Sequence, residues 1–194
     1  MKQWSKQRLL CQYQMKPLHS ALPSAPTLAN TRSAAVLIGL VSRPNGIHVL
    51  LTKRAEHLRH HPNQVSFPGG KQDPQDKNLY HTALRETHEE IGIHAEQVEL
   101  IGALPSLETI SRFHVTPYLA WVSCHYTSRI NQDEVAELFE VPLNVLLEPN
   151  NYFQYPIKTR HYSRQITATF QSSHLIWGVT AQILQQLQQH LTHP

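Results

Sequence analysis

The sequence predicts an α/β fold in which a mixed β-sheet is covered by helices on both of its faces. Two observations predict this. Most of the apolar runs of strand length follow one another in hairpin fashion, and helical patterns are interspersed among them rather than alternating strictly with them. A chain of 194 residues is of ordinary size for one domain, and such a domain buries a core without disulfides.

The clearest pair of expected strands is formed by residues 34–41 and 47–52. Both are continuous apolar runs, and the Arg43-Pro44-Asn45-Gly46 connection between them has the composition of a tight turn, which predicts a hairpin. Further strands are expected at residues 99–104, 115–124, 152–155 and 165–170. Proline cannot donate to a ladder, so Pro117 fits its strand only near the strand start or at a sheet edge.

Helical periodicity appears in three segments. Residues 77–91 and residues 174–191 have apolar positions at helical spacing, and a short helix is expected at residues 143–147. Trp121 and Trp177 lie within apolar patterns, so we expect both to pack in the core rather than to stack on a ligand.

The chain is expected to divide near residue 31. Residues 1–31 mix polar residues with three prolines, which predicts a short amphipathic or irregular lead-in followed by an extended arm. The first long apolar run begins just after Arg32, so residues 32–194 are expected to form the folded domain.

Composition narrows the class of protein. A formal net charge of +3 suits anionic ligands, but the lysines and arginines are not clustered as in a nucleic-acid binder. Cys11 and Cys124 form no metal or disulfide motif, which favours a reducing compartment. No signal-peptide pattern and no apolar run of about 18 residues is present. We therefore expect a cytoplasmic protein with a small-molecule ligand, no nucleic-acid partner and no membrane partner; the sequence leaves the oligomeric state open.

The segment from Phe67 to Ile93 carries the most chemical information. It reads as a Phe-Pro-Gly-Gly loop, a polar stretch containing Asp73 and Asp76, and a helix that Gly92 terminates. A helix advances about 100° per residue, so two groups of residues separate onto different faces. The group expected to pack is Tyr80, Leu84, Thr87 and Ile91, and the group expected to face a cleft or solvent is Glu86, Glu89 and Glu90.

The three glutamates are unfavourable as local structure. Like charges three or four residues apart on a helix repel by about 0.2–0.5 kcal/mol per pair, and Glu89 and Glu90 also lie at the negative end of the helix dipole. A divalent cation would offset this repulsion, and hard carboxylate oxygens suit Mg²⁺ or Mn²⁺. A bare Glu-x-x-Glu-Glu is more often a solvated acidic face, and Gly69-Gly70 alone is as often an ordinary tight turn. The combination of the two motifs favours a metal or phosphate site.

This segment resembles the Nudix box, which runs Gly, five residues, Glu, seven residues, and then Arg-Glu-apolar-any-Glu-Glu-any-Gly-apolar. Residues 85–93 match its second half, with Thr87 at the usually apolar position. In the first half, counted from Gly70, the glutamate position falls on Asp76, and eight residues rather than seven separate Asp76 from Arg85.

Upstream residues are similar to the signature of the bacterial coenzyme A pyrophosphatase branch of this superfamily. The similar segments are Leu50-Leu51-Thr52-Lys53-Arg54-Ala55, Arg59 and Phe67-Pro68-Gly69-Gly70. Residues 133–143 and 176–180 also look similar to this branch. The signature has glycine where this chain has Asn63, and asparagine is the non-glycine residue that best tolerates a positive φ.

The resemblance implies a Nudix-type α/β/α sandwich, with residues 32–194 as the hydrolase domain. It also implies metal-dependent hydrolysis of a nucleoside diphosphate linked to another moiety, here coenzyme A, giving 3′,5′-ADP and 4′-phosphopantetheine. Another diphosphate, such as ADP-ribose, a dinucleotide or a damaged nucleoside triphosphate, stays open as the substrate. A non-catalytic nucleotide-binding module usually lacks part of the glutamate set, whereas all three glutamates are present here. An RNA-decapping enzyme would favour a basic groove, which the sequence does not indicate.

The same resemblance assigns roles to residues. Glu86, Glu89 and Glu90 become metal ligands, with Glu89 as a ligand or the activator of a water molecule. Arg85 would orient these glutamates by ion pairing, and Gly69 and Gly70 would bring backbone close to metal or phosphate.

The remaining assignments concern the loops. A loop carboxylate often completes such sites, and Glu134 is our candidate ahead of Glu108 and Glu137. Arg54 and Arg59 would bind the anionic ends of the substrate, because a guanidinium forks well onto phosphate. The alternative interpretation of both arginines is that they carry surface charge or form a structural ion pair. The histidines at 57, 60, 61, 81 and 88 lack ligand spacing and are expected at the surface.

Overall fold

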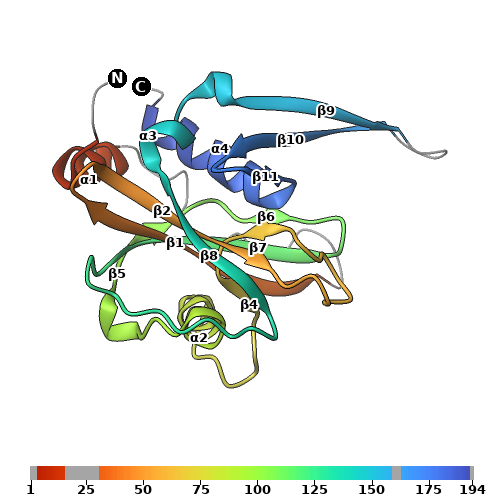
Figure 1. The fold of residues 1–194 in the computed structure, drawn as a ribbon, viewed down its shortest axis with the longest axis horizontal. Coiled ribbons are helices and arrows are strands. Elements are labelled where there is room, and N and C mark those ends of the chain that lie inside the picture. The colour runs from red at the N-terminus through yellow and green to blue at the C-terminus, as the bar shows by residue number, and fades with distance from the viewer. Residues whose placement is uncertain (1–3, 16–30, 159–162, 193–194) are drawn as a thin grey trace.

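The structure is a computed structural model, and it describes residues 4–15, 31–158 and 163–192. In the described part a large mixed sheet lies between helices, and a smaller sheet with a projecting hairpin lies to one side (Figure 1). The main-sheet strands are β1 (Arg32–Arg43), β2 (Gly46–Arg54), β3 (Val65–Ser66), β4 (Gly69–Lys71), β5 (Val98–Ala103), β6 (Leu107–Glu108), β7 (Phe113–Val122) and β8 (Val135–Pro142). The smaller sheet contains β9 (Tyr152–Lys158), β10 (Ser163–Gln171) and β11 (His174–Trp177). The helices are α1 (Lys6–Met15), α2 (Leu79–Ile91), α3 (Leu143–Leu146) and α4 (Val179–Thr192), with short 3₁₀ turns at Ala95–Gln97 and Pro149–Asn151.

The main sheet is built around the expected hairpin. β1 and β2 pair in antiparallel fashion across the turn at Pro44 and Asn45, with Arg43 opposite Gly46. β7 lies parallel to β1 on its other side, and every other pairing in this sheet is antiparallel, so the sheet is mixed as the sequence predicts. The path through the sheet is β3-β2-β1-β7-β5, while β4, β6 and β8 pair with β1, β7 and β2, respectively.

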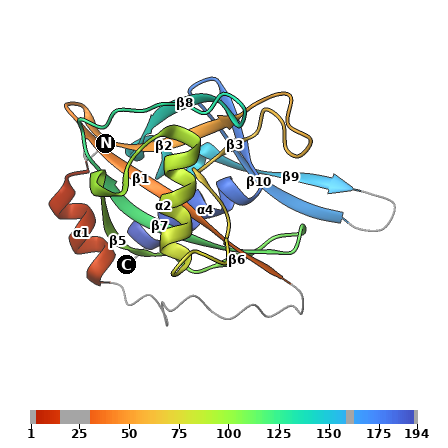
Figure 2. The same cartoon turned by 90° about the horizontal axis from the view of Figure 1, so that it is seen from below.

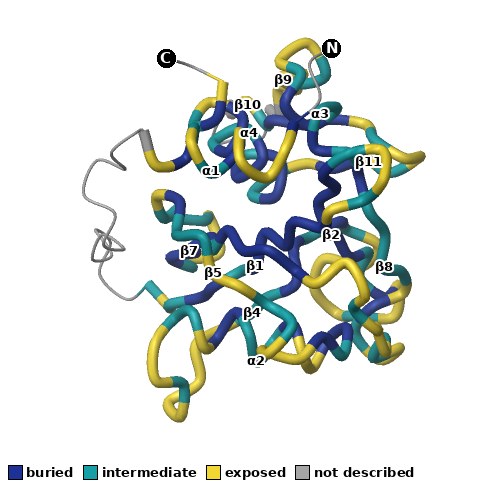
Figure 3. The backbone as a smooth tube through the Cα atoms, turned by 90° about the vertical axis from the view of Figure 1, so that its left-hand side faces the viewer, coloured by how far each residue is buried: buried dark blue, intermediate teal, exposed yellow. Residues whose placement is uncertain are grey.

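Helices cover both faces of the main sheet, as expected. Successive strand residues point to opposite faces, and β1 divides accordingly. Ile38 and Leu40 join a core with α1 and α4, whereas Ala35 and Leu37 join a second core with α2. β1 runs through the middle of the molecule as a largely buried strand, with α2 on one side of it and α1 and α4 on the other (Figures 2 and 3).

The lead-in contributes a helix that packs on the end of the chain. α1 contacts α4, and the Tyr13 ring lies edge-on to the His190 ring with 5.0 Å between centroids. The Tyr13 hydroxyl also donates to the carbonyl of Ala103 at 2.8 Å. The extended arm expected within residues 16–30 lies outside the described residues. No helix of the described part combines the length and the apolar character needed to span a bilayer.

The expected helix at residues 174–191 is wrong in its first turn. Residues 174–177 form β11, which pairs with β10 in antiparallel fashion, and α4 begins only at Val179. Ser172 and Ser173 have φ values of 49° and 65°, so a two-residue turn with positive φ at both positions reverses the chain here. Serine is an uncommon residue for such a turn, which is why the sequence did not indicate it. Trp177 consequently lies on this small sheet with 38 % of its surface exposed, whereas Trp121 is buried as expected.

The position of Pro117 in its strand differs from the expectation. It lies in the middle of β7 and is buried, neither at the strand start nor at the sheet edge. Its carbonyl accepts from the Leu104 N–H at 2.9 Å, at the point where the chain leaves β5 before β6 begins. The N–H and C=O of one extended residue point to the same side, so the missing donor of Pro117 lies on the side of Leu104, just past the end of β5, and not on the side of β1.

Candidate active site

α2 has the boundaries that place its glutamates. The Asn78 side chain accepts from the His81 N–H at 3.0 Å and begins the helix. Gly92 ends the helix with a φ of 73° and donates to the carbonyl of His88, as its position in the sequence predicts. Thr87 and Ile91 are buried against the sheet.

The two glycines before α2 are required for different reasons. β4 pairs with β1, with Gly69 opposite Val36 and Gly70 opposite Ala35. A Cβ atom on Gly69, whose φ is 153°, would overlap the backbone of β1. A Cβ atom on Gly70 would overlap the carboxylate of Glu86. The Gly-Gly pair thus allows both the strand pairing and the seating of a helix carboxylate against the loop.

Arg85 connects the carboxylates of this region. Its Nη1 donates to Glu86 Oε1 and to Glu89 Oε2, each at 2.9 Å. Its Nη2 donates to the carbonyl of Lys71 at 3.0 Å, which joins the helix to the end of β4. These ion pairs hold Glu86 and Glu89 in fixed positions relative to the loop.

Asp76 occupies the place at which the first half of the Nudix pattern departs by one residue. It accepts from Arg85 Nε at 3.0 Å and from Arg85 Nη2 at 3.1 Å, and also from the Thr82 hydroxyl at 2.9 Å. The hydrogen bonds from Arg85 are the main reason why the pKa of Asp76 is lowered to about 2. The extra residue in the loop therefore does not prevent Asp76 from fixing the arginine.

Glu90 lies deeper than the sequence indicated. It was expected on a face directed to a cleft or solvent, but only 2 % of its surface is exposed. Burial, followed by the nearby charge of Glu86, raises its pKa to about 8. Its Oε2 atom has no hydrogen-bond partner among the described residues. A buried carboxylate with a free oxygen is costly unless a positive charge is bound next to it.

Glu86 is likewise partly buried and surrounded by other carboxylates. Burial is the main cause of its raised pKa, and the charges of Glu89 and Glu134 raise it further, against the lowering effect of Arg85. Glu89, in contrast, is half exposed, with 52 % of its side-chain surface accessible. The three helix glutamates thus range from buried to solvent-facing within one turn.

Glu134 is the loop carboxylate that the structure brings to this group. Its charge raises the pKa of both Glu86 and Glu90. The turn that carries it is tied to α2, because the Asn131 N–H donates to the Glu90 carbonyl at 2.9 Å. The other two candidates have different partners. Glu108 on β6 lies beside His114 on β7, and Glu137 pairs with His174 at 2.9 Å.

Asn131 contacts Glu134 and was not among the expected site residues. Its side-chain oxygen accepts from the Asp133 N–H at 3.2 Å, and its amide nitrogen donates to Glu134 Oε1 at 3.4 Å. The Asn-x-Asp spacing is typical of a turn that an asparagine side chain closes on its own backbone, and this was the available signal.

The two arginines that were predicted to bind substrate differ in placement. Arg54 ends β2, and its positive charge lowers the pKa of Glu90, so it lies near the glutamates. Arg59 is exposed in the loop between β2 and β3 and makes no ion pair among the described residues. In the same loop Asn63 has a φ of 59°, which is the conformation expected at this position.

The expected surface histidines are exposed, and one has a contact near the site. His57 Nε2 lies 3.1 Å from the carbonyl of Asp133, and the Ala55 N–H donates to the Glu134 carbonyl at 2.9 Å. These contacts join the loop after β2 to the turn that carries Glu134.

The donor set fits a divalent metal ion. The three helix glutamates and Glu134 all offer carboxylate oxygens, which hard cations prefer, and one buried oxygen of Glu90 has no hydrogen-bond partner among the described residues. Within the described ranges no three His, Cys, Asp or Glu side chains are already arranged around one point. Glu86 and Glu89 each give one carboxylate oxygen to Arg85.

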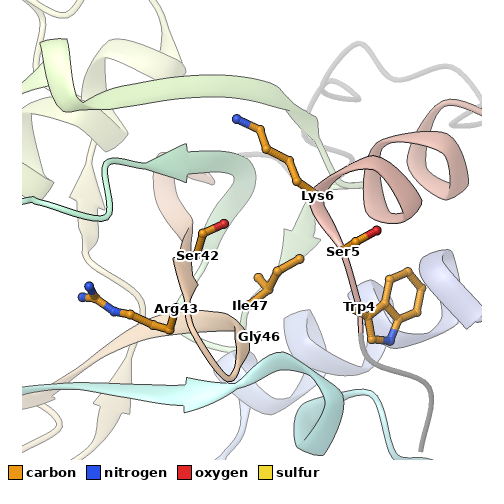
Figure 4. A pocket seen from close by; sticks show the side chains of 7 residues that line it. All are labelled: Trp4, Ser5, Lys6, Ser42, Arg43, Gly46 and Ile47. Atoms are coloured by element: carbon orange, nitrogen blue, oxygen red, sulfur yellow. The ribbon is translucent and has the colours of Figure 1, made fainter.

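A separate pocket of about 300 Å³ lies between the start of α1 and the β1–β2 turn (Figure 4). Its lining residues include Trp4, Lys6, Arg43 and Ile47 but no carboxylate. It lies at the opposite end of β1 from the residues that pair with Gly69 and Gly70. We therefore take the carboxylate group, and not this pocket, as the candidate active site.

Comparison with known proteins agrees with this geometry. The model of the NUDIX domain matches residues 31–160. An uncharacterized Nudix hydrolase NudL of Yersinia enterocolitica is 44 % identical over 163 residues, which cover 84 % of this chain and 83 % of the relative. The corresponding protein of Yersinia pestis is 42 % identical over 164 residues, with coverage of 84 % and 82 %.

Solved structures show the same fold. A Nudix hydrolase of M. smegmatis, RenU, superposes with a TM-score of 0.51 and 25 % identity, covering 59 % of this chain and 72 % of that one. A C. elegans Ap4A hydrolase superposes with a TM-score of 0.50 and 23 % identity, covering 57 % and 80 %. The domain match, the relatives and the arrangement of Arg85 with its glutamates lead to one conclusion: the chain belongs to the Nudix family, as a hydrolase of nucleoside diphosphate derivatives.

Proposed function

We propose that this Nudix hydrolase cleaves the pyrophosphate bond of coenzyme A and its derivatives, releasing 3′,5′-ADP and 4′-phosphopantetheine. The observation that carries the proposal is the position of Arg54. This arginine belongs to the segment similar to the coenzyme A pyrophosphatase signature, and its charge acts on the buried Glu90. An anion bound at the glutamates would therefore meet the guanidinium of Arg54, which binds phosphate well.

Mg²⁺ or Mn²⁺ is the proposed cofactor. Glu86, Glu89 and Glu90 would hold it, with the backbone carbonyl of Gly70 as a further ligand. When bound, such an ion neutralises charge on the phosphoryl oxygens and lowers the pKa of a bound water molecule.

The residues of the chain have separate tasks in this proposal. Arg85, held by Asp76, keeps the carboxylates of Glu86 and Glu89 in place. Glu89 is solvent-accessible, so it is suited to accept a proton from the attacking water. Glu134 adds a carboxylate from the turn that precedes β8, and Arg54 and Arg59 bind the anionic ends of the substrate.

The proposal also covers the cellular compartment, the domain boundaries and the type of partner. Cys11 and Cys124 are both free and exposed, which suits a reducing, cytoplasmic compartment. Residues 32–194 would form the hydrolase domain and residues 1–31 its lead-in. The partner would be a small-molecule substrate, with neither nucleic acid nor membrane involved.

A substrate panel tests the proposed function. Coenzyme A, ADP-ribose, a diadenosine polyphosphate and a nucleoside triphosphate are incubated with the full chain and Mg²⁺ or Mn²⁺, and the products are identified by mass. We expect the highest kcat/KM for coenzyme A, with 3′,5′-ADP and 4′-phosphopantetheine as products. Efficient cleavage of ADP-ribose without cleavage of coenzyme A would reject the coenzyme A assignment and direct attention to Asn63, where the chain departs from the signature.

A further inference from the structure

The second sheet has two faces of different character. In β10, Thr167 and Thr169 point to one face, and Ile166, Ala168 and Phe170 point to the other, because side chains alternate along a strand. The register across the sheet places residues of like character side by side. Ala168 pairs with Phe153 and with Trp177, Ile166 pairs with Tyr155, and Phe170 pairs with Leu175.

The face with the threonines is covered by the protein itself. Thr167, Thr169 and Ile176 are buried, and the Thr167 hydroxyl lies 3.5 Å from Gln185 Oε1 on α4. This inner face accounts for the attachment of the sheet to the rest of the molecule.

The other face is apolar and open. We define the outer face as Phe153, Tyr155, Phe170, Leu175 and Trp177, together with the smaller or less exposed Ile166 and Ala168 between them. The five large residues expose 46 %, 62 %, 61 %, 49 % and 38 % of their surface, respectively. They are five of the seven large hydrophobic residues that are exposed in the described part of the chain, the others being Leu100 and Ile110. Exposure of this kind is concentrated on one sheet rather than scattered.

The extent of the outer face suits association. A large aromatic side chain offers about 150–250 Å², so at these fractions the five residues expose on the order of 400–500 Å². That lies within the range of about 300–600 Å² for the largest apolar patch on a typical monomer, a patch that is often functional. Two such faces together provide roughly 900 Å² of apolar surface. Because about 56–65 % of the area of an interface is apolar, such a contact totals about 1,400–1,600 Å², within the range of about 1,200–2,000 Å² of a stable interface.

We propose that the outer face is the contact between two copies of this chain, packed sheet on sheet about a twofold axis. None of the seven residues of the face is charged, so identical faces can meet without repulsion. The mode of contact is face packing rather than strand addition, because Pro156 removes a backbone donor from β9, which pairs on only one side in the described part. The hairpin projects beyond the main sheet and leaves this face free of its own domain (Figures 1 and 2). The proposal is independent of the substrate.

Sedimentation of the full chain tests this proposal. The wild type is measured from about 1 to about 100 µM, a range that brackets a micromolar dissociation constant. We expect the mass to rise with concentration from the monomer value of 22.2 kDa to twice that value. Phe170→Lys places two like charges in the proposed contact and should raise the dissociation constant by at least about tenfold.

Ile110→Lys is the matched control, since Ile110 is 71 % exposed but lies on the β6–β7 turn. It should sediment as the wild type does. Circular dichroism and an unchanged melting temperature establish that both variants are folded. A wild type that stays monomeric throughout, or a dimer that Phe170→Lys leaves intact while folded, overturns the proposal. Binding of monomers to lipid vesicles through Phe170 would likewise replace the dimer by a membrane contact.

Discussion

The carboxylate of Asp76 faces the guanidinium of Arg85 with two oxygens against two nitrogens, at 3.0 and 3.1 Å. The same guanidinium binds Glu86 and Glu89. One acid outside the helix thereby determines the positions of two acids within it. This relationship leads to the first of five predictions.

Asp76→Asn should lower kcat by about tenfold to a hundredfold with a smaller effect on KM. The variant loses a charged hydrogen bond worth roughly 1.5–3 kcal/mol, and a less restrained Arg85 holds the glutamates less well. Steady-state kinetics with coenzyme A at saturating Mg²⁺ measures the effect. Asp73→Asn is the control, because Asp73 lies in the same loop but its side chain accepts from the Gln75 N–H rather than from Arg85. Equal loss in both variants would contradict the positioning role of Asp76.

Glu90→Gln should abolish most turnover in a folded protein. The substitution keeps the shape of the side chain but removes a charge from the proposed metal ligands. Turnover of coenzyme A and the far-ultraviolet circular dichroism spectrum are the two measurements. Glu96→Gln, at an exposed glutamate of the following 3₁₀ turn, should retain wild-type activity. Near-normal turnover of the Glu90 variant would exclude Glu90 as a ligand.

The same substitution should change how metal-free stability depends on pH. The pKa of Glu90 is raised from 4.5 to about 8 in the folded protein, mainly by burial. The folded state therefore favours the protonated acid, and the wild type loses stability as the pH rises from about 4.5 to about 8. Glu90→Gln lacks this loss. In chelator, the variant should gain stability relative to the wild type across that window, as measured by urea unfolding; a difference that is constant with pH would contradict this.

Mg²⁺ or Mn²⁺ should raise the melting temperature of the wild type. A ligand at one hundred times its dissociation constant stabilises the folded state by about 2.7 kcal/mol, which corresponds to roughly 5–10 °C for a chain of this size. Thermal scans with the metal are compared with scans in NaCl of equal ionic strength. The Glu86→Gln/Glu90→Gln double variant should show little increase. If wild type and double variant respond equally, the metal binds elsewhere.

The arginines should determine substrate choice. If Arg54 or Arg59 binds the terminal 3′-phosphate, coenzyme A should exceed dephospho-coenzyme A in kcat/KM by about tenfold to a hundredfold, as a charged hydrogen bond of roughly 1.5–3 kcal/mol implies. Alanine at the responsible arginine should reduce this preference more than it slows dephospho-coenzyme A. Arg112→Ala, which changes a residue of the turn just before β7, is a control arginine substitution. Equal turnover of both compounds would remove the 3′-phosphate from the recognition scheme.

The sequence predicted the parts of the fold that local signals determine. The β1–β2 hairpin has apolar runs on both sides of Pro44-Asn45-Gly46, and α2 ends at a glycine, so both were found. β11 was missed because its turn uses two serines. β4 was missed because a Gly-Gly-Lys segment has no strand preference of its own and becomes a strand only by pairing with β1.

The site shows the same division. The spacing of Arg85, Glu86, Glu89 and Glu90 indicated one group on a helix, and the structure places them together. Helical spacing could not indicate that Glu90 is buried, because its burial depends on packing against β4 and on the turn at Asn131, which are distant in sequence. The proximity of Glu134 to Glu90 follows from the same tertiary contact and has no local signal.

Gly69 and Gly70 are required for different steric reasons, so substitutions at these two positions have different consequences. At Gly69 the obstacle is the backbone of β1, which no side-chain exchange can move, so this position should accept nothing larger. At Gly70 the obstacle is the far end of the Glu86 side chain, and a shorter acid at position 86 makes room. An alanine at position 70 can therefore arise together with an aspartate at position 86, so these two sites are expected to covary although each is intolerant when changed alone.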